Sequence, residues 1–124
     1  MLSFGAFAQG NSSIAVANPN VEGLYATPEM CSKMIRLELA KLNKFSVYDK
    51  FDMQDVYDTN ESYKTCLSKK CLVEFGQKLG ANYMITGSFD LLGNKIVITL
   101  KMIDVANNTV YKSGLKEFTN QEKE

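Results

Sequence analysis

The sequence predicts a single α/β (α+β) domain, in which one mixed five-stranded sheet carries its helices mainly on one face. Three observations support this fold class. In the first half of the chain, short apolar runs alternate with helix-like periodicity, as in parallel strands joined by right-handed crossovers. In the second half, three strand-like runs follow one another with short turns between them, which favours antiparallel pairing. Apolar side chains alternate with charged and hydroxyl side chains along the fourth predicted strand, which indicates a less covered sheet face there. The predicted order is β-α-β-α-α-β-β-β.

The first predicted strand is the small apolar run at 12–17, which is typical of a buried strand. A loop at 18–24 follows, marked by the sequence Asn-Pro-Asn. The first predicted helix, 28–43, begins after Thr27, because threonine caps helices and the proline that follows suits the first helical position. Its apolar residues recur at helical spacing: Cys31, Met34, Ile35, Leu39 and Leu42.

The middle of the chain predicts a second strand at 45–50, where apolar and polar residues alternate. Asp52 is expected to cap a short helix at 53–57. The polar segment 58–65 has no periodic pattern, so we predict a loop there.

The last predicted helix and the three strands after it carry the clearest pattern. The helix begins after Ser68 and ends at Gly80, since glycine readily adopts the left-handed conformation that closes a helix. A Gly-Asn turn joins the first two of the strands that follow. These strands are predicted at 82–92, 95–105 and 109–118.

The composition disfavours nucleic-acid binding and most catalytic chemistry. Lys+Arg and Asp+Glu number 14 each, so the net charge is zero, whereas a domain that grips phosphates normally carries a basic excess. Histidine, the commonest general base and metal ligand, is absent. The sequence also contains no glycine-rich phosphate loop and no nucleophile elbow. We therefore expect no enzyme activity, no cofactor, no metal and no nucleic-acid partner.

Several acidic residues are interpreted as solvated cap and loop residues, with carboxylate chemistry as the alternative. They form the pairs Asp49/Asp52 and Asp55/Asp58. Glu38 projects near the centre of the apolar stripe of the first helix. It either reaches solvent or a lysine, or else acts as a buried functional acid.

The N-terminus resembles the end of a secretory signal. Ala6-Phe7-Ala8 fits the small-x-small pattern of a signal-peptidase site, so 1–8 is interpreted as a signal-peptide remnant. The alternative is an apolar, frayed N-terminus of a cytosolic protein. The domain then covers 9–118 and a polar tail covers 119–124. No apolar run approaches the roughly 20 residues that a membrane-spanning helix needs.

The three cysteines predict one disulfide and one buried thiol. Cys66 and Cys71 lie five residues apart, and in an exported protein such a pair can be oxidised. Two free thiols and a metal site are the alternatives, although two thiolates without a further ligand pair do not complete a tetrahedral site. Cys31 falls on the apolar face of the first helix and is expected to pack as a small hydrophobic residue.

Three segments, 71–76, 79–88 and 95–105, together resemble the bacterial envelope domains grouped around the TolB N-terminal domain and the CsgG-like family. The pattern is a helix that ends in Leu-Gly-Ala, a strand that passes through Thr-Gly-Ser, and a hairpin whose second strand closes on Ile-Asp-Val. Its motif residues are Gly80, Ala81, Thr86, Gly87, Ser88 and Asp104. The resemblance covers 13–118 and implies a domain that binds other envelope proteins without catalysis. The pair of cysteines is similar to one found in some exported members.

Three functional hypotheses follow. The first is a non-catalytic, exported interaction domain in the periplasm or at the outer membrane, with envelope proteins as partners. The second is a subunit of an envelope secretion or assembly complex, CsgG-like, which would form a homo-oligomer. The third is a small-ligand sensor or enzyme, which requires a concave pocket with converging polar groups.

Overall fold

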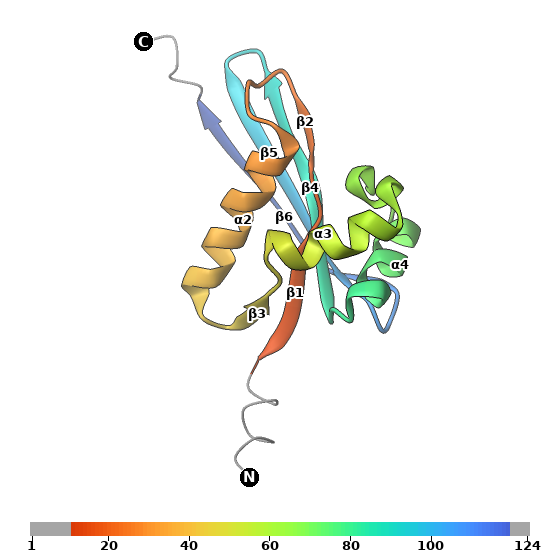
Figure 1. Ribbon diagram of the computed structural model, residues 1–124. Coiled ribbons are helices and arrows are strands. Elements are labelled where there is room, and N and C mark those ends of the chain that lie inside the picture. The colour runs from red at the N-terminus through yellow and green to blue at the C-terminus, as the bar shows by residue number, and fades with distance from the viewer. Residues whose placement is uncertain (1–10, 120–124) are drawn as a thin grey trace.

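A computed structural model describes residues 11–119, which form one mixed α+β domain (Figure 1). The fold class is therefore confirmed. The predicted signal-peptide remnant at 1–8 and the tail from residue 120 lie outside the described residues. The elements in chain order are β1 (Ser12–Val16), β2 (Asn20–Glu22), α2 (Pro28–Leu42), β3 (Phe45–Val47), α3 (Lys50–Thr59), the 3-10 helix η1 (Glu61–Thr65), α4 (Lys69–Leu79), β4 (Tyr83–Leu92), β5 (Lys95–Asp104) and β6 (Thr109–Thr119).

The sheet has six strands, one more than predicted, in the order β3-β1-β4-β5-β6, with β2 also paired to β4. Strands β3, β1 and β4 are parallel, and β4, β5 and β6 are antiparallel. Strand β2 lies where the sequence predicted only a loop. It forms because β4 is longer than β1: β1 pairs with Tyr83–Ile85, and β2 pairs with the stretch Ser88–Asp90 further along the same edge.

Helices cover both faces of the sheet, and both faces of β1 are therefore buried. Ile14 and Val16 point into a cluster with α2, whereas Ala15 and Ala17 point into a cluster with α3, η1 and α4. All four side chains have no exposed surface. The prediction that helices lie mainly on one face holds for α3 and α4, but α2 packs on the opposite face. Figure 1 shows α2 and α4 on opposite sides of the strands.

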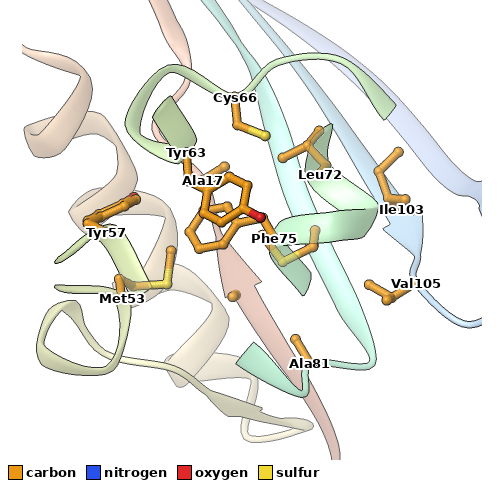
Figure 2. Close-up of a cluster of buried hydrophobic side chains, with 12 residues drawn as sticks. Ala17, Met53, Tyr57, Tyr63, Cys66, Leu72, Phe75, Ala81, Ile103 and Val105 are labelled. Carbon is orange, nitrogen blue, oxygen red and sulfur yellow. The ribbon is translucent and has the colours of Figure 1, made fainter. Parts of the chain in front are cut away.

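The core between the sheet, α3 and α4 is built around Phe75 (Figure 2). Its ring stacks on Tyr63 with the ring centroids 5.0 Å apart, and it meets Tyr57 at 5.5 Å. Tyr63 belongs to η1, within the segment predicted as an unordered loop. That segment is ordered because Tyr63 is buried and because the side chain of Asn60 caps the short helix through Ser62 N.

Helix α3 is longer than predicted and starts earlier. The prediction placed the cap at Asp52, but the cap is Asp49, whose side chain accepts hydrogen bonds from Phe51 N and Asp52 N. Asp52 in turn accepts from Asp49 N, which completes a reciprocal capping box. Because the chain turns into this box, β3 ends at Val47 instead of continuing to residue 50.

Candidate functional site

The most apolar concave surface of the described chain is a groove between α2 and strands β4 and β5. Helix α2 lies over β1 and β3 and buries Cys31, Ile35 and Leu39, so the sheet face beyond it is only partly covered. The resulting space has a volume of about 330 Å³. We call it the α2 groove; its main lining residues are Met34, Leu42, Ile85, Phe89, Ile98 and Leu100.

The floor of the α2 groove follows from the register of the antiparallel strands. Residues directly opposite each other share a face, so Phe89 lies beside Ile98. Leu100 lies between two glycines, Gly87 on β4 and Gly114 on β6. Neither neighbour has a side chain, so the groove is deeper on both sides of Leu100.

Gly87 is required by a close approach of the two strands. A Cβ atom at this position would overlap the carbonyl oxygen of Thr99 and would come within 2.8 Å of the Leu100 side chain. At Gly114, by contrast, a Cβ atom would meet no atom within 4 Å.

Helix α2 extends the apolar surface of the groove outward. Met30, Met34, Leu37 and Leu42 are each exposed over slightly more than half of their surface. Adjacent exposed apolar side chains are typical of interaction surfaces, and methionine adapts its shape to different partners. Glu38 lies beside them and is exposed, and its carboxylate pairs with Lys41 Nζ at 3.0 Å.

Strand β6 forms the far side of this face and is exposed along its whole length. Lys112 and Lys116 pair with Met102 and Ile98 of β5, so they share the face of the groove. The groove is therefore apolar at its centre and has two lysines along one side.

The residues singled out in the sequence do not converge on one site. Cys66 and Cys71 are joined by a disulfide at the start of α4, and Cys31 is a buried free thiol. Asp49 and Asp52 cap α3, and Asp58 accepts a hydrogen bond from Gln54 at 2.8 Å. These acidic groups therefore have structural partners.

The residues on which the expected resemblance rests lie at the end of α4, along β4 and at the end of β5. Gly80 closes α4 with φ +80°, and Ala81 is buried behind it. Thr86 and Ser88 lie on β4, on the face opposite the groove, and the Thr86 hydroxyl is buried without a hydrogen-bond partner in the described chain. Asp104 accepts a hydrogen bond from Asn107 N at the turn before β6.

The sequence prediction missed the α2 groove because its signal is weak. Leu37 and Met30 are apolar, yet they lie outside the buried stripe of α2. The apolar surface of this helix is therefore wider than the stripe that the core needs, and this was the one indication of the groove in the sequence. Within residues 11–119, no group of three acidic, cysteine or histidine side chains is placed to hold a metal ion. None of the helices in that range is long and apolar enough to cross a membrane.

Several solved structures share this fold. The LpoB C-terminal domain from Salmonella enterica is 16% identical with a TM-score of 0.70, over 94% of this chain and 91% of that one. LpoB from E. coli is 16% identical with a TM-score of 0.74, over 90% of this chain but only 58% of that one. TolB from Acinetobacter baumannii is 15% identical with a TM-score of 0.57, and the match covers 90% of this chain and 24% of TolB. Comparison with curated proteins finds no significant match.

The expected resemblance to the TolB and CsgG-like group is borne out in part. TolB shares the fold at low similarity, and the comparisons give no support to a CsgG-like assignment. In this chain the Leu-Gly-Ala segment ends α4 and the Thr-Gly-Ser segment lies at the close contact between β4 and β5. The family model of the peptidoglycan-synthase activator LpoB matches residues 24–118, and the chain belongs to this family.

Proposed function

We propose that this chain is a non-catalytic activator of a peptidoglycan synthase and that it docks on the synthase through the α2 groove. The observation that carries the proposal is the family match over 24–118, which includes α2 and the two strands, β4 and β5, that form the groove. An activator acts by binding an enzyme, so it needs a binding surface and not catalytic residues.

The chemistry of the groove supports a protein partner. Stable interfaces have an apolar centre that excludes water and a polar rim. Phe89, Ile98 and Leu100 supply the centre, while Glu38, Lys112 and Lys116 lie at its border. The expected partner surface has a projecting apolar side chain, with acidic groups placed to meet the two lysines.

The proposed location is the envelope outside the cytoplasmic membrane, where peptidoglycan is built. The disulfide between Cys66 and Cys71 supports this location, because disulfides persist in oxidising compartments. The chain would reach it by export, as the small-x-small pattern at Ala6-Phe7-Ala8 predicts.

Glycan polymerisation by the purified synthase of the same organism, with and without this protein, tests the proposal. The protein should raise the polymerisation rate. Met34→Glu and Leu42→Glu should each weaken the binding that drives this effect by about tenfold or more, because a carboxylate would be buried against apolar surface. Both side chains are half exposed, so the fold should tolerate the changes.

Leu115→Glu is the matched control. Leu115 is 63% exposed and lies on the opposite face of the sheet, where it pairs with Thr99. It should leave activation unchanged. No increase in rate with the unmodified protein would exclude the activator function. Full activation by Met34→Glu and Leu42→Glu would exclude the α2 groove while leaving the function intact.

A further inference from the structure

A second cavity, separate from the α2 groove, lies between α2, α3 and the segment that includes η1. Its volume is about 360 Å³, within the range of small-molecule sites. We call it the charged pocket; its main lining residues are Glu29, Arg36, Lys50, Phe51, Tyr57 and Lys64. It meets the requirement of the third sequence hypothesis, a concave pocket with converging polar groups.

Arg36, the single arginine of the chain, is half buried in this pocket and has no carboxylate partner within residues 11–119. Its Nη1 donates to Ser32 Oγ at 3.4 Å, a long contact to a neutral group. The ion pairs of residues 11–119 are Lys41–Glu38 and Lys95–Glu117, and neither includes Arg36. A guanidinium has five N–H donors in a planar fork, so most of its capacity is unused inside the protein.

Two further cations and a phenol line the same pocket. Lys64 Nζ lies 5.9 Å from the centre of the Tyr57 ring, and Lys50 Nζ lies 5.5 Å from the centre of the Phe51 ring. The Tyr57 hydroxyl carries its proton at neutral pH, as any phenol does, and can donate a hydrogen bond. Figure 2 shows Tyr57 at the edge of the buried cluster, away from Leu72 and Ile103.

The acidic groups near the pocket limit the charge of a ligand. Glu29 is the single carboxylate among the lining residues, against three cations. Asp49 also lies close enough to affect Arg36 electrostatically, while its Oδ1 accepts the capping hydrogen bonds of α3. One negative charge is therefore favoured, whereas a second charge would meet Glu29.

Phe51 and Met53 supply the apolar part of the lining, beside the neutral polar residues Asn18, Ser32 and Gln54. Phe51 is 70% exposed at the pocket, and Met53 is buried beneath it. A ligand can therefore place a compact apolar body against these side chains while its charged end faces Arg36.

We propose that the charged pocket binds a small organic carboxylate with a compact apolar body, and that Arg36 holds the carboxylate through two parallel hydrogen bonds. Arginine and carboxylate are matched in geometry, and such paired contacts are among the strongest in proteins. This site is independent of synthase activation and needs no contact with the α2 groove.

Titrations of the purified protein with benzoate and hexanoate, followed by NMR, test the proposal. Benzamide and hexanamide are the matched neutral probes. Millimolar carboxylate should shift the side-chain N–H resonance of Arg36 and the backbone resonances of Phe51 and Tyr57, and the amides should not. Arg36→Gln should weaken binding by about tenfold or more, and Arg36→Lys by less, because the charge remains and the fork is lost.

Lys78→Gln is the control, because Lys78 is exposed in the last turn of α4, outside the pocket. Thermal unfolding of each variant separates lost binding from lost folding. Absence of a response to both carboxylates would overturn the proposal. Equal binding of the amides, or an equal loss of affinity in Lys78→Gln, would overturn it as well.

Discussion

Gly87→Ala tests whether the close contact between β4 and β5 limits the stability of the sheet. The added methyl would overlap the Thr99 carbonyl oxygen, which belongs to a strand that is paired on both sides and cannot retreat freely. Separating the strands would cost about two ladder hydrogen bonds at about 1 kcal/mol each. Moving the Leu100 side chain away from its rotamer would add about 1 kcal/mol. The expected loss is therefore about 3 kcal/mol, and a chain of this size should melt about 10 °C lower.

Gly114→Ala on the neighbouring strand is the matched control. Both glycines flank Leu100 on the same face, but the new methyl at residue 114 would meet open space. Replacing glycine there should stabilise the protein by about 0.5 kcal/mol, because the unfolded chain loses conformational freedom. Urea unfolding monitored by circular dichroism measures both changes. Equal stability of the two variants would refute the steric argument.

The remaining predictions concern the cysteines and one tyrosine. Cys66→Ser combined with Cys71→Ser should lower the free energy of unfolding by about 2 kcal/mol, measured by urea unfolding, since the disulfide closes a loop of only a few residues; an unchanged midpoint would contradict this. Burial raises the pKa of the Cys31 thiol, so alkylation of this thiol should be slow in the folded protein. After unfolding without reductant, alkylation should be rapid and mass spectrometry should find one modified cysteine. Fast labelling of the native state would refute the burial argument. The pKa of Tyr57 rises from 10.0 to about 12 on folding, so its contribution to stability is complete below pH 10 and is lost as the pH rises through 12; Tyr57→Phe should remove this part of the pH dependence of unfolding.

The regular elements could be predicted because their signals are local. Thr27 and Ser68 each cap a helix in the structure as their sequence positions predict. Strands β4, β5 and β6 follow the predicted runs within two residues at each end. The prediction of Asp52 as the cap of α3 is wrong, because Asp52 is the third residue of the helix and Asp49, three residues earlier, is the cap. Both residues take part in the same reciprocal hydrogen bonds, so either aspartate is a plausible cap residue by type alone.

The sites depend on contacts between distant segments, which local patterns do not record. The α2 groove exists because α2 does not cover β5. The position of α2 on the sheet is set by the packing of Ile35 and Leu39 on Ile14 and Val16. The charged pocket requires α2 to lie beside α3. Arg36 is the single arginine of the sequence, but only the fold shows that it has no carboxylate partner within residues 11–119.

The burial of both faces of β1 also determines when this domain can fold. Strand β1 comes first among the described elements, yet one of its two partners, β4, begins only at Tyr83. Hydrogen bonds between Ser13 and Asn82 span 69 residues. A chain made or exported from its N-terminus therefore leaves the β4-facing edge of the apolar β1 segment unpaired until β4 has been delivered, although β3 comes earlier and can pair with the other edge. The Cys66–Cys71 bond can close locally before then. A chain interrupted before β4 would leave that edge of β1 open to pairing with other chains, so a factor that shields nascent strands should act during this interval.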